Sequence, residues 1–200
     1  MALHKLSETY MNAVREKLSE ERFHHSMCVS RAAVELAQQY GCDPEKAEYA
    51  GILHDVMKEA GEKEQRAIIA QGGIPLCDVE EKTPKLWHAI AGAAYAEQML
   101  DVSDRDILNA IRYHTTGRAG MGLLEKILYL ADFISSERTY DGVEVMRAAA
   151  RHGLEPGIFT GLAFSIRDLS VRGGAIHPDT MSAYNEMILS GETKGQPPLL

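Results

Sequence analysis

The chain has 200 residues, of which 45% are hydrophobic and 25% charged, with a formal net charge of −8. This size suits one domain with a substantial core, and the acidic balance argues against a general affinity for nucleic-acid backbones. The three cysteines are scattered and form no C-x-x-C motif, which favours reduced thiols over disulfides or a thiolate metal site. No apolar run reaches the ~18–20 residues of a membrane span, and no signal-peptide pattern is present, so we expect a cytoplasmic protein.

Apolar residues recur with helical spacing along the chain, and no stretch alternates with a period of two, which predicts an all-α protein. The first predicted helix covers residues 3–18. Ser19 is a candidate N-cap for a second helix, which ends near Gly41. Asp43-Pro44 supplies the cap and the first residue of a third helix, which we expect Gly61 to close.

Further along, Thr83-Pro84 and Ser103 mark the starts of two more helices, whereas the glycine-rich segment 115–122 predicts a loop. The predicted helices of this part cover residues 84–100, 103–114, 123–135, 142–152, 157–171 and 178–190. Together these elements predict one compact domain of about eight to ten helices over residues 1–190. We expect the polar tail over residues 191–200 to be disordered.

Six imidazole and carboxylate side chains stand in otherwise apolar helical segments: His25, His54, Asp55, His88, His114 and Asp132. Helical spacing turns them towards the interior. Burying a neutral polar group without a partner costs roughly 2–7 kcal/mol, and an ion costs more. A single inward histidine is more often a hydrogen-bonded core residue than a ligand, but the joint pattern indicates a metal site. Mixed imidazole and carboxylate ligands suit zinc, iron or manganese, so the pattern predicts a metal-dependent hydrolase.

The order His25, His54-Asp55, Asp132 resembles the metal motif of the HD-domain phosphohydrolase superfamily. The finer pattern is similar to its YqeK family, the symmetrical bis(5'-nucleosyl)-tetraphosphatases, and extends over residues 15–190. The match is looser at Glu59 and after Leu189. The matching stretches are Arg22-Phe-His-His25-Ser26, Gly51-Ile-Leu-His-Asp-Val-Met-Lys58, Arg112-Tyr-His-Thr-Thr-Gly-Arg118, Leu124-Glu-Lys-Ile-Leu-Tyr-Leu-Ala-Asp132-Phe-Ile and His177-Pro-Asp-Thr180.

The resemblance implies an HD-domain helical bundle that holds a divalent transition metal, most often iron in that family, with manganese or another metal as the alternative. The implied ligands are His25, His54, Asp55 and Asp132. Two roles stay open for His88 and His114: they contact the substrate phosphates and protonate the departing oxygen, or they complete a second metal site bridged by Asp55. Asp55, His88 and His114 are therefore the expected catalytic residues, and one or two ions would activate the attacking water. The implied reaction cleaves diadenosine tetraphosphate, or a related dinucleoside polyphosphate, symmetrically to two ADP.

Basic and hydroxyl side chains near these motifs fit a polyphosphate substrate. Lys58 follows His54 by one helical turn, and Arg118 ends a loop of hydroxyls and glycines whose backbone N–H groups can approach an anion. The helix that starts at His177-Pro178 could set its N-terminus against the nucleotide. The expected substrate-binding residues are Arg22, Lys58, His88, His114, Thr115, Thr116, Arg118, Arg138, Ile176, His177 and Thr180.

Three alternatives stay open at this point. The same site could act on a smaller nucleotide, as a nucleotidase or phosphodiesterase. It could use two irons for oxygen chemistry, although the number of lysines and arginines favours a phosphorylated substrate. The chain could also be a non-catalytic nucleotide-binding domain, although such domains usually lose ligands. The residues fix neither the native metal nor the oligomeric state, for which a homodimer is one option.

Overall fold

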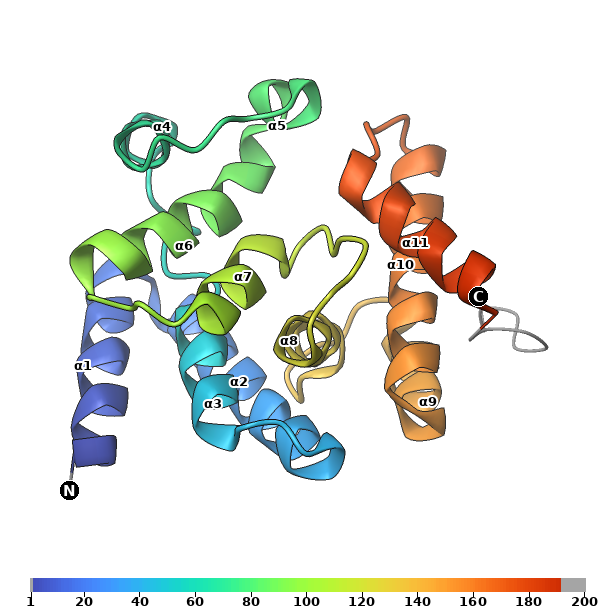
Figure 1. The fold of residues 1–200 in the computed structure, drawn as a ribbon, viewed down its shortest axis with the longest axis horizontal. Coiled ribbons are helices and arrows are strands. Elements are labelled where there is room, and N and C mark those ends of the chain that lie inside the picture. Colours follow the sequence, from blue (N-terminus) through green and yellow to red (C-terminus); the bar gives the residue numbers. More distant parts are fainter. Residues whose placement is uncertain (1, 192–200) are drawn as a thin grey trace.

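The computed structural model describes residues 2–191, which form eleven α-helices and one 3₁₀ turn and contain no strand (Figure 1). The all-α prediction is confirmed, with slightly more helices than expected. The predicted disordered tail falls largely on residues 192–200, outside the described part. The helices are α1 (Ala2–Lys17), α2 (Glu20–Tyr40), α3 (Pro44–Leu53), α4 (Glu62–Gln71), α5 (Asp78–Lys82), α6 (Trp87–Met99), α7 (Arg105–Tyr113), α8 (Leu123–Ile134), α9 (Val143–His152), α10 (Leu154–Val171) and α11 (Pro178–Ser190).

The capping residues read from the sequence act as expected in the first part of the chain. Ser19 caps α2 and accepts a hydrogen bond from the backbone N–H of Arg22. Gly41 ends α2 with a left-handed φ of 73°, a conformation that glycine adopts at little cost. Asp43 caps α3 and accepts from the N–H of Glu45 at 2.9 Å. These local signals therefore fix where α2 ends and α3 begins.

The predicted end of α3 at Gly61 is wrong. The helix stops at Leu53, and residues 54–59 form successive tight turns with hydrogen bonds such as Lys58 N to Asp55 O, 2.8 Å. Gly61 instead precedes α4 as its N-cap. Neighbouring residues in a regular helix point about 100° apart, so leaving the helix at His54 frees this residue and Asp55 to face the same space.

Two short helices, α4 and α5, were not expected from the sequence. Within α4, only Gln65 and Ile69 are buried, so the helix has almost no apolar stripe to reveal it. The α5 helix has only five residues, and Cys77 precedes it as the N-cap. Both elements depend on tertiary contacts more than on their own sequences.

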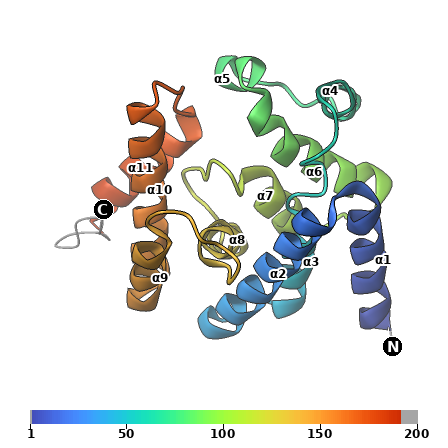
Figure 2. The ribbon, with the colours of Figure 1, turned by 180° about the vertical axis from the view of Figure 1, so that it is seen from behind.

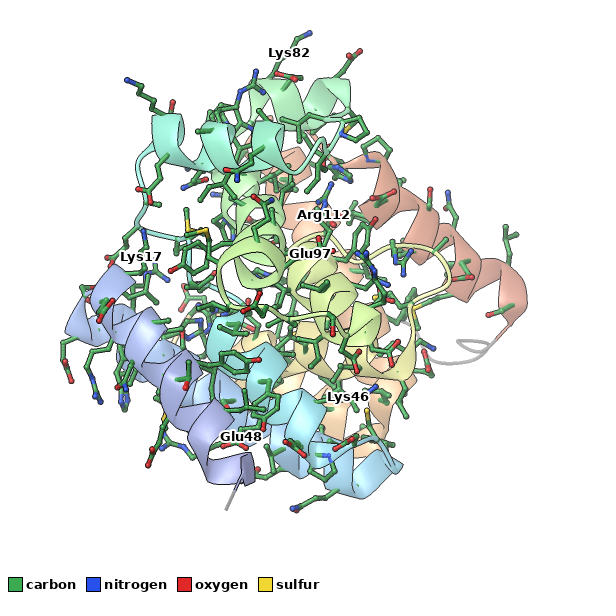
Figure 3. All side chains as sticks on the ribbon, turned by 60° about the vertical axis from the view of Figure 1, so that its left-hand side comes forward. Lys17, Lys46, Glu48, Lys82, Glu97 and Arg112 are labelled. Carbon is green, nitrogen blue, oxygen red and sulfur yellow. The ribbon has the colours of Figure 1, made fainter. Side chains whose placement is uncertain are left out.

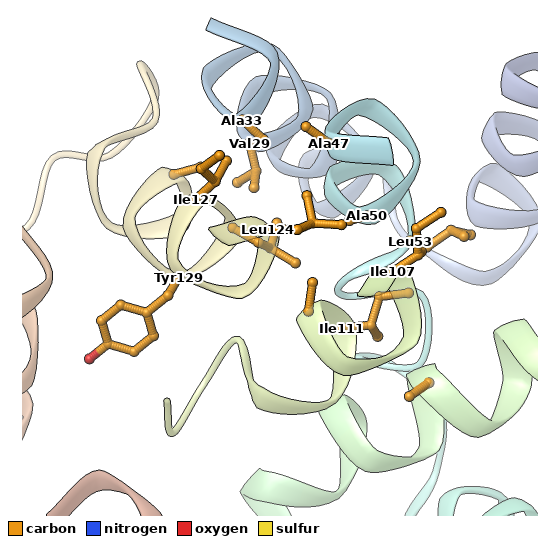
Figure 4. Close-up of a cluster of buried hydrophobic side chains, with 14 of the residues drawn as sticks. Val29, Ala33, Ala47, Ala50, Leu53, Ile107, Ile111, Leu124, Ile127 and Tyr129 are labelled. Atoms are coloured by element: carbon orange, nitrogen blue, oxygen red, sulfur yellow. The ribbon is translucent and has the colours of Figure 1, made fainter. Parts of the chain in front are cut away.

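The core lies where α2, α3, α7 and α8 pack together. Figure 4 shows side chains from these helices meeting there, among them Val29, Leu53, Ile111 and Ile127, and all four are fully buried. In Figures 1 and 2, α8 lies at the centre of the molecule, with α1–α3 and α4–α6 on one side and α9–α11 on the other. The ends of several helices are thereby brought together around α8.

Gly51 allows α2 and α3 to cross closely. A Cβ added at this position would lie 2.4 Å from Ser30 Cα and 2.9 Å from Ser30 N, which are backbone atoms that cannot swing aside. This close crossing brings His25 on α2 next to His54 at the end of α3.

Charged side chains lie mostly on the outside of the helices, as Lys82 and Glu97 illustrate in Figure 3. Arg112 is different, because it reaches from α7 to the buried carboxylate of Glu80 on α5. Across residues 2–191, no helix is both long and apolar enough to cross a membrane.

Candidate active site

Six predicted side chains converge in the interior, each from near the end of a helix or from α2. His54 ends α3, Asp55 follows it, and His114 ends α7. His88 lies in the first turn of α6, and Asp132 lies in the last turn of α8. His25, His54, Asp55, His88 and His114 are each no more than 6% exposed. These five side chains face a common interior, and Asp132 lies at its edge with its side chain 21% exposed.

One group of donors surrounds Oδ2 of Asp55. His25 Nε2 lies 3.3 Å from His54 Nε2 and 3.8 Å from Asp55 Oδ2. His54 Nε2 lies 3.7 Å from the same oxygen, and Asp132 Oδ1 lies 3.2 Å from His25 Nε2. These are the four residues expected to be metal ligands.

A second group surrounds the other oxygen of Asp55. His88 Nε2 and His114 Nε2 lie 3.3 and 3.5 Å from Asp55 Oδ1, and 3.4 Å from each other. Asp55 therefore presents one oxygen to each group. Its position is the one that a bridging carboxylate would need if two ions were bound.

The hydrogen bonds at Nδ1 determine what each Nε2 can do. His54, His88 and His114 each place Nδ1 2.8 Å from the backbone carbonyl three residues earlier, which can only accept a hydrogen bond. Nδ1 must therefore carry the proton, and in a neutral ring Nε2 is left with a lone pair. In His25, Nδ1 donates its proton to a side chain instead of a backbone carbonyl: Oε1 of Glu137 lies 2.5 Å away.

The protonation states suit cation binding. Burial lowers the pKa of His54 to about 4 and that of His88 to about 3, so both rings are neutral at pH 7. Burial also opposes the charge on Asp55, but His54, His114 and the Lys58 ammonium outweigh it and hold its pKa well below the usual range. At His25, burial opposes the charged ring, but Asp132 and Glu137 outweigh it and raise its pKa. The cluster thus offers neutral imidazoles at His54 and His88 and ionised carboxylates, which are the forms that bind metals.

A divalent metal fits this arrangement. Asp55 Oδ1 is buried and accepts no hydrogen bond from the described residues; the two imidazole nitrogens beside it present lone pairs, and the Lys58 ammonium lies 3.4 Å away at the edge of the cluster. Lone pairs facing one another in a dry interior repel unless a cation lies between them. Nδ1–H donation to a carbonyl or carboxylate is also the usual arrangement behind a metal-binding histidine.

Three cationic side chains border the cluster, as expected for a phosphate site. Lys58 Nζ lies 3.0 Å from His88 Nε2 and 3.4 Å from Asp55 Oδ1. Arg138 pairs with the Asp132 carboxylate and lies 3.3 Å from His25 Nε2. Arg22 is farther out, 3.9 Å from Asp55 Oδ2. Lys58 and Arg138 therefore lie next to different groups of the cluster.

The loop of residues 115–122 is placed only partly as expected. Thr115 Oγ1 lies 3.2 Å from His114 Nε2, within the cluster. Thr180 on α11 donates to the backbone carbonyl of Thr116 at 2.7 Å and so anchors this loop. Arg118 makes two hydrogen bonds, of 2.6 and 2.8 Å, to the buried Glu125. Its guanidinium is engaged within the protein instead of pointing freely at the cluster.

His177 has a structural role at the start of α11 in addition to any contact with substrate. Its Nδ1 accepts the N–H of Asp179 at 3.1 Å, so Nε2 carries the proton of the neutral ring. Nε2 lies 3.4 Å from Glu80 Oε1 and 3.5 Å from Cys77 Sγ. Although these three side chains cluster, a proton at Nε2 leaves no lone pair for a metal. The group links α5 to α11, and Ile176 directly precedes the capping histidine.

Sequence reasoning missed the residues that support the cluster. Glu137 contacts His25, and Arg112 pairs with Glu80 at 2.5 Å. No periodic pattern marks Glu137, because it follows the end of α8 and lies outside any helix. Its proximity to Asp132 in sequence was the only available signal.

Comparisons with known proteins agree with this geometry. Residues 22–137 match the family model described as HD domain. The symmetrical bis(5'-nucleosyl)-tetraphosphatase of Bacillus subtilis is 38% identical over 90% of this chain and 97% of its own length, and the protein of that name from Staphylococcus aureus is 37% identical over 86% and 90%. A crystal structure from Clostridium acetobutylicum, described as a "predicted HD superfamily hydrolase involved in NAD metabolism", matches with a TM-score of 0.88 and 36% identity, covering 92% of this chain and 97% of that one. The chain belongs to the HD-domain family, among relatives named symmetrical bis(5'-nucleosyl)-tetraphosphatase.

Proposed function

We propose that this protein hydrolyses diadenosine tetraphosphate, or a related dinucleoside polyphosphate, symmetrically to two nucleoside diphosphates. The observation that carries the proposal is the buried cluster around Asp55, in which neutral imidazoles and ionised carboxylates meet between Lys58 and Arg138. The names of relatives that share 37–38% of their residues with this chain supply the substrate class.

The cofactor is proposed to be a divalent transition metal, with iron as the first candidate and manganese as the second. His25, His54, Asp55 and Asp132 would hold it. When bound, the metal supplies Lewis-acid polarisation and activates water. His88, His114 and the other oxygen of Asp55 would take a second ion or face the phosphates. The number of metal ions per chain separates these two arrangements.

The chain's own residues would bind and orient the phosphates. Lys58 and Arg138 would neutralise phosphate oxygens next to the cluster. Arg22, at the rim of the cluster, would contact a phosphate farther along the substrate. In the reaction, a water oxygen forms a bond to phosphorus while the bridging P–O bond breaks. Charge then develops on the departing phosphate oxygen, and whichever of Lys58 and Arg138 contacts that half of the polyphosphate can stabilise it. With its pKa lowered to about 3, His88 is better suited to accept a hydrogen bond or bind a cation than to donate a proton.

The proposal also covers the location, the ligand class and the assembly of the protein. We propose a cytoplasmic protein that binds small nucleotides, not nucleic-acid polymers, in keeping with the net charge of −8. A homodimer is proposed as its assembly. The chain spans nearly the full length of its tetraphosphatase relatives.

A product assay tests the proposed reaction. The metal-loaded protein would be incubated with diadenosine tetraphosphate, NAD, ATP, AMP and a cyclic nucleotide, and the products identified by mass spectrometry. We expect ADP as the sole product from diadenosine tetraphosphate and much slower turnover of the others. Preferential turnover of a mononucleotide, or of NAD, would replace the proposed substrate. Chelator-treated protein is the control for metal dependence.

A further inference from the structure

The segment after α8, residues 135–138, carries two side chains into the cluster. Glu137 Oε1 lies 2.5 Å from Nδ1 of His25. The guanidinium of Arg138 pairs with the Asp132 carboxylate, and its Nε donates to the backbone carbonyl of Asp132 at 2.9 Å. Two of the expected metal ligands therefore depend on this segment for their hydrogen-bond partners.

His25 is supported differently from the other three histidines. His54, His88 and His114 each bond a carbonyl three residues earlier, which the adjoining turn of backbone already fixes in place. Glu137 is 112 positions away from His25 in sequence and belongs to no helix. The orientation of the His25 ring therefore depends on how firmly residues 135–138 are held.

Ser135 provides part of that support. Its side chain is 1% exposed, and its hydroxyl donates to Glu137 Oε1 at 2.8 Å. The same carboxylate oxygen thus meets both Ser135 and His25. This arrangement leaves the Glu137 carboxylate little freedom to turn away from the histidine.

Arg147 on α9 also holds residues 135–138 in place. Its guanidinium donates to the backbone carbonyls of Ile134 at 3.2 Å, Ser135 at 2.8 Å and Arg138 at 3.1 Å. The last carbonyls of a helix have no partner within the helix, so α8 leaves such acceptors where it ends. One planar guanidinium with several fixed N–H donors can bind them together, whereas an ammonium group radiates its donors from one point.

We propose that Glu137 and Arg147 are positioning residues for the metal centre. Arg147 fixes segment 135–138, the segment fixes Glu137, and Glu137 orients the ring of His25 and keeps its proton on Nδ1. Arg147 lies beyond residues 22–137 that match the HD-domain model, so α9 contributes to metal binding from outside that region. The inference rests on the metal site of the proposed function but not on the identity of the substrate.

Metal affinity tests the proposal directly. Full-length protein would be stripped of metal, and its dissociation constant for Co²⁺ measured by competition with a chelator. Removing a hydrogen-bond partner behind a ligand typically weakens metal binding about 10- to 100-fold, and we expect that loss in Glu137→Ala. Glu137→Gln keeps an oxygen that accepts the Nδ1 proton, so it should recover most of the affinity. Arg147→Ala should also weaken binding, and Arg147→Lys should recover it only in part.

The controls separate positioning from folding. Arg172→Ala removes an exposed arginine that pairs with Asp168 on the surface and should leave Co²⁺ affinity unchanged. The melting temperature of each metal-free variant shows whether the fold is intact, and Glu137→Gln and Arg147→Lys remain informative if an alanine variant does not fold. Wild-type affinity in folded Glu137→Ala and Arg147→Ala would overturn the inference. Failure of the wild type to bind any Co²⁺ would reject the metal site and the inference together, whereas an unexpected substrate would reject only the proposed reaction.

Discussion

At the scale of single residues, Asp55 is the carboxylate that both groups of the cluster share. Its Oδ1 is buried among the lone pairs of His88 and His114 and accepts no hydrogen bond from the described residues. Asp55→Asn would place an amide that can donate hydrogen bonds to these nitrogens, each worth about 1 kcal/mol. We expect the variant to lose bound metal and activity, and its metal-free form to be less stable than the wild type at pH 7 despite these hydrogen bonds, because the lowered pKa of Asp55 means that the folded protein favours the ionised carboxylate. Metal analysis and urea denaturation check this, and a variant that keeps its metal would contradict the assigned ligand role.

Lys58 should matter for substrate more than for metal. Its ammonium reaches the cluster while its side chain stays 30% exposed, so it can contact a bound phosphate without being part of the core. A charge-assisted contact is worth on the order of 1.5–3 kcal/mol, so Lys58→Ala should lower kcat/KM about 10- to 150-fold. Steady-state kinetics at matched metal content measure the effect. Lys82→Ala, which alters an exposed lysine on α5, should leave the kinetics unchanged.

At the scale of helices, the crossing of α2 and α3 is the contact that assembles the site. Gly51→Ala would put a Cβ 2.4 Å from the Cα of Ser30, so the two helices must move apart. We expect lower thermal stability and, because His25 and His54 belong to these helices, loss of metal. Gly61→Ala is a matched control, since its added Cβ would meet nothing within 4 Å. Normal metal content in a folded Gly51→Ala variant would show that the close crossing is not required.

The ion pair between Glu80 on α5 and Arg112 on α7 should make the stability of the protein depend on pH in the acid range. Burial opposes the charge on Glu80, but the N–H of Cys77 and the Arg112 guanidinium outweigh it and keep the pKa of this carboxyl below its ordinary value. A lowered pKa in the folded state means that the stabilisation is present above the unfolded-state pKa of about 4.3 and is lost as pH falls through the folded-state value. Glu80→Gln should therefore be less stable than the wild type at pH 7, with the difference shrinking below about pH 4.3. Urea denaturation of the metal-free proteins from pH 7 down through this range measures the difference in stability. A difference that does not change with pH would contradict the stabilising role of the ionised Glu80 carboxylate.

The helices show which features the sequence could predict. Ser19, Gly41 and Asp43 act through contacts within a few residues, so their capping roles could be predicted from the sequence. The early end of α3 could not be predicted, because His54 and Asp55 leave the helix to meet His25 on α2, His88 on α6 and His114 at the end of α7. The six ligand candidates were identified by residue type and context, whereas Glu137 was missed because only the folded chain brings it to His25. Arg118 was expected at the phosphates, yet its nearest anion is Glu125, which sequence spacing alone did not single out.

At the scale of the whole molecule, the turns after α3 and the segment after α8 place positive charge at two ends of one cluster. Lys58 lies beside the group that contains His88, and Arg138 lies beside the group that contains His25, with Asp55 shared between the groups. A chain of four phosphates bound across both cations would present its middle to the cluster. The arrangement therefore favours attack at the central anhydride, under the proposed function.

Hydrolysis in water enriched with heavy oxygen tests this choice of bond. If water attacks either of the two central phosphorus atoms, its oxygen enters the ADP that contains that atom, while the other ADP leaves with the former bridging oxygen. Each turnover should then give one labelled and one unlabelled ADP, so half of the ADP carries a single heavy oxygen. Mass spectrometry of the products at early time points measures the ratio, and ADP incubated with the enzyme alone controls for later exchange. Formation of AMP and ATP would show that the polyphosphate binds off-centre, with Lys58 and Arg138 contacting phosphates on the same side of the broken bond.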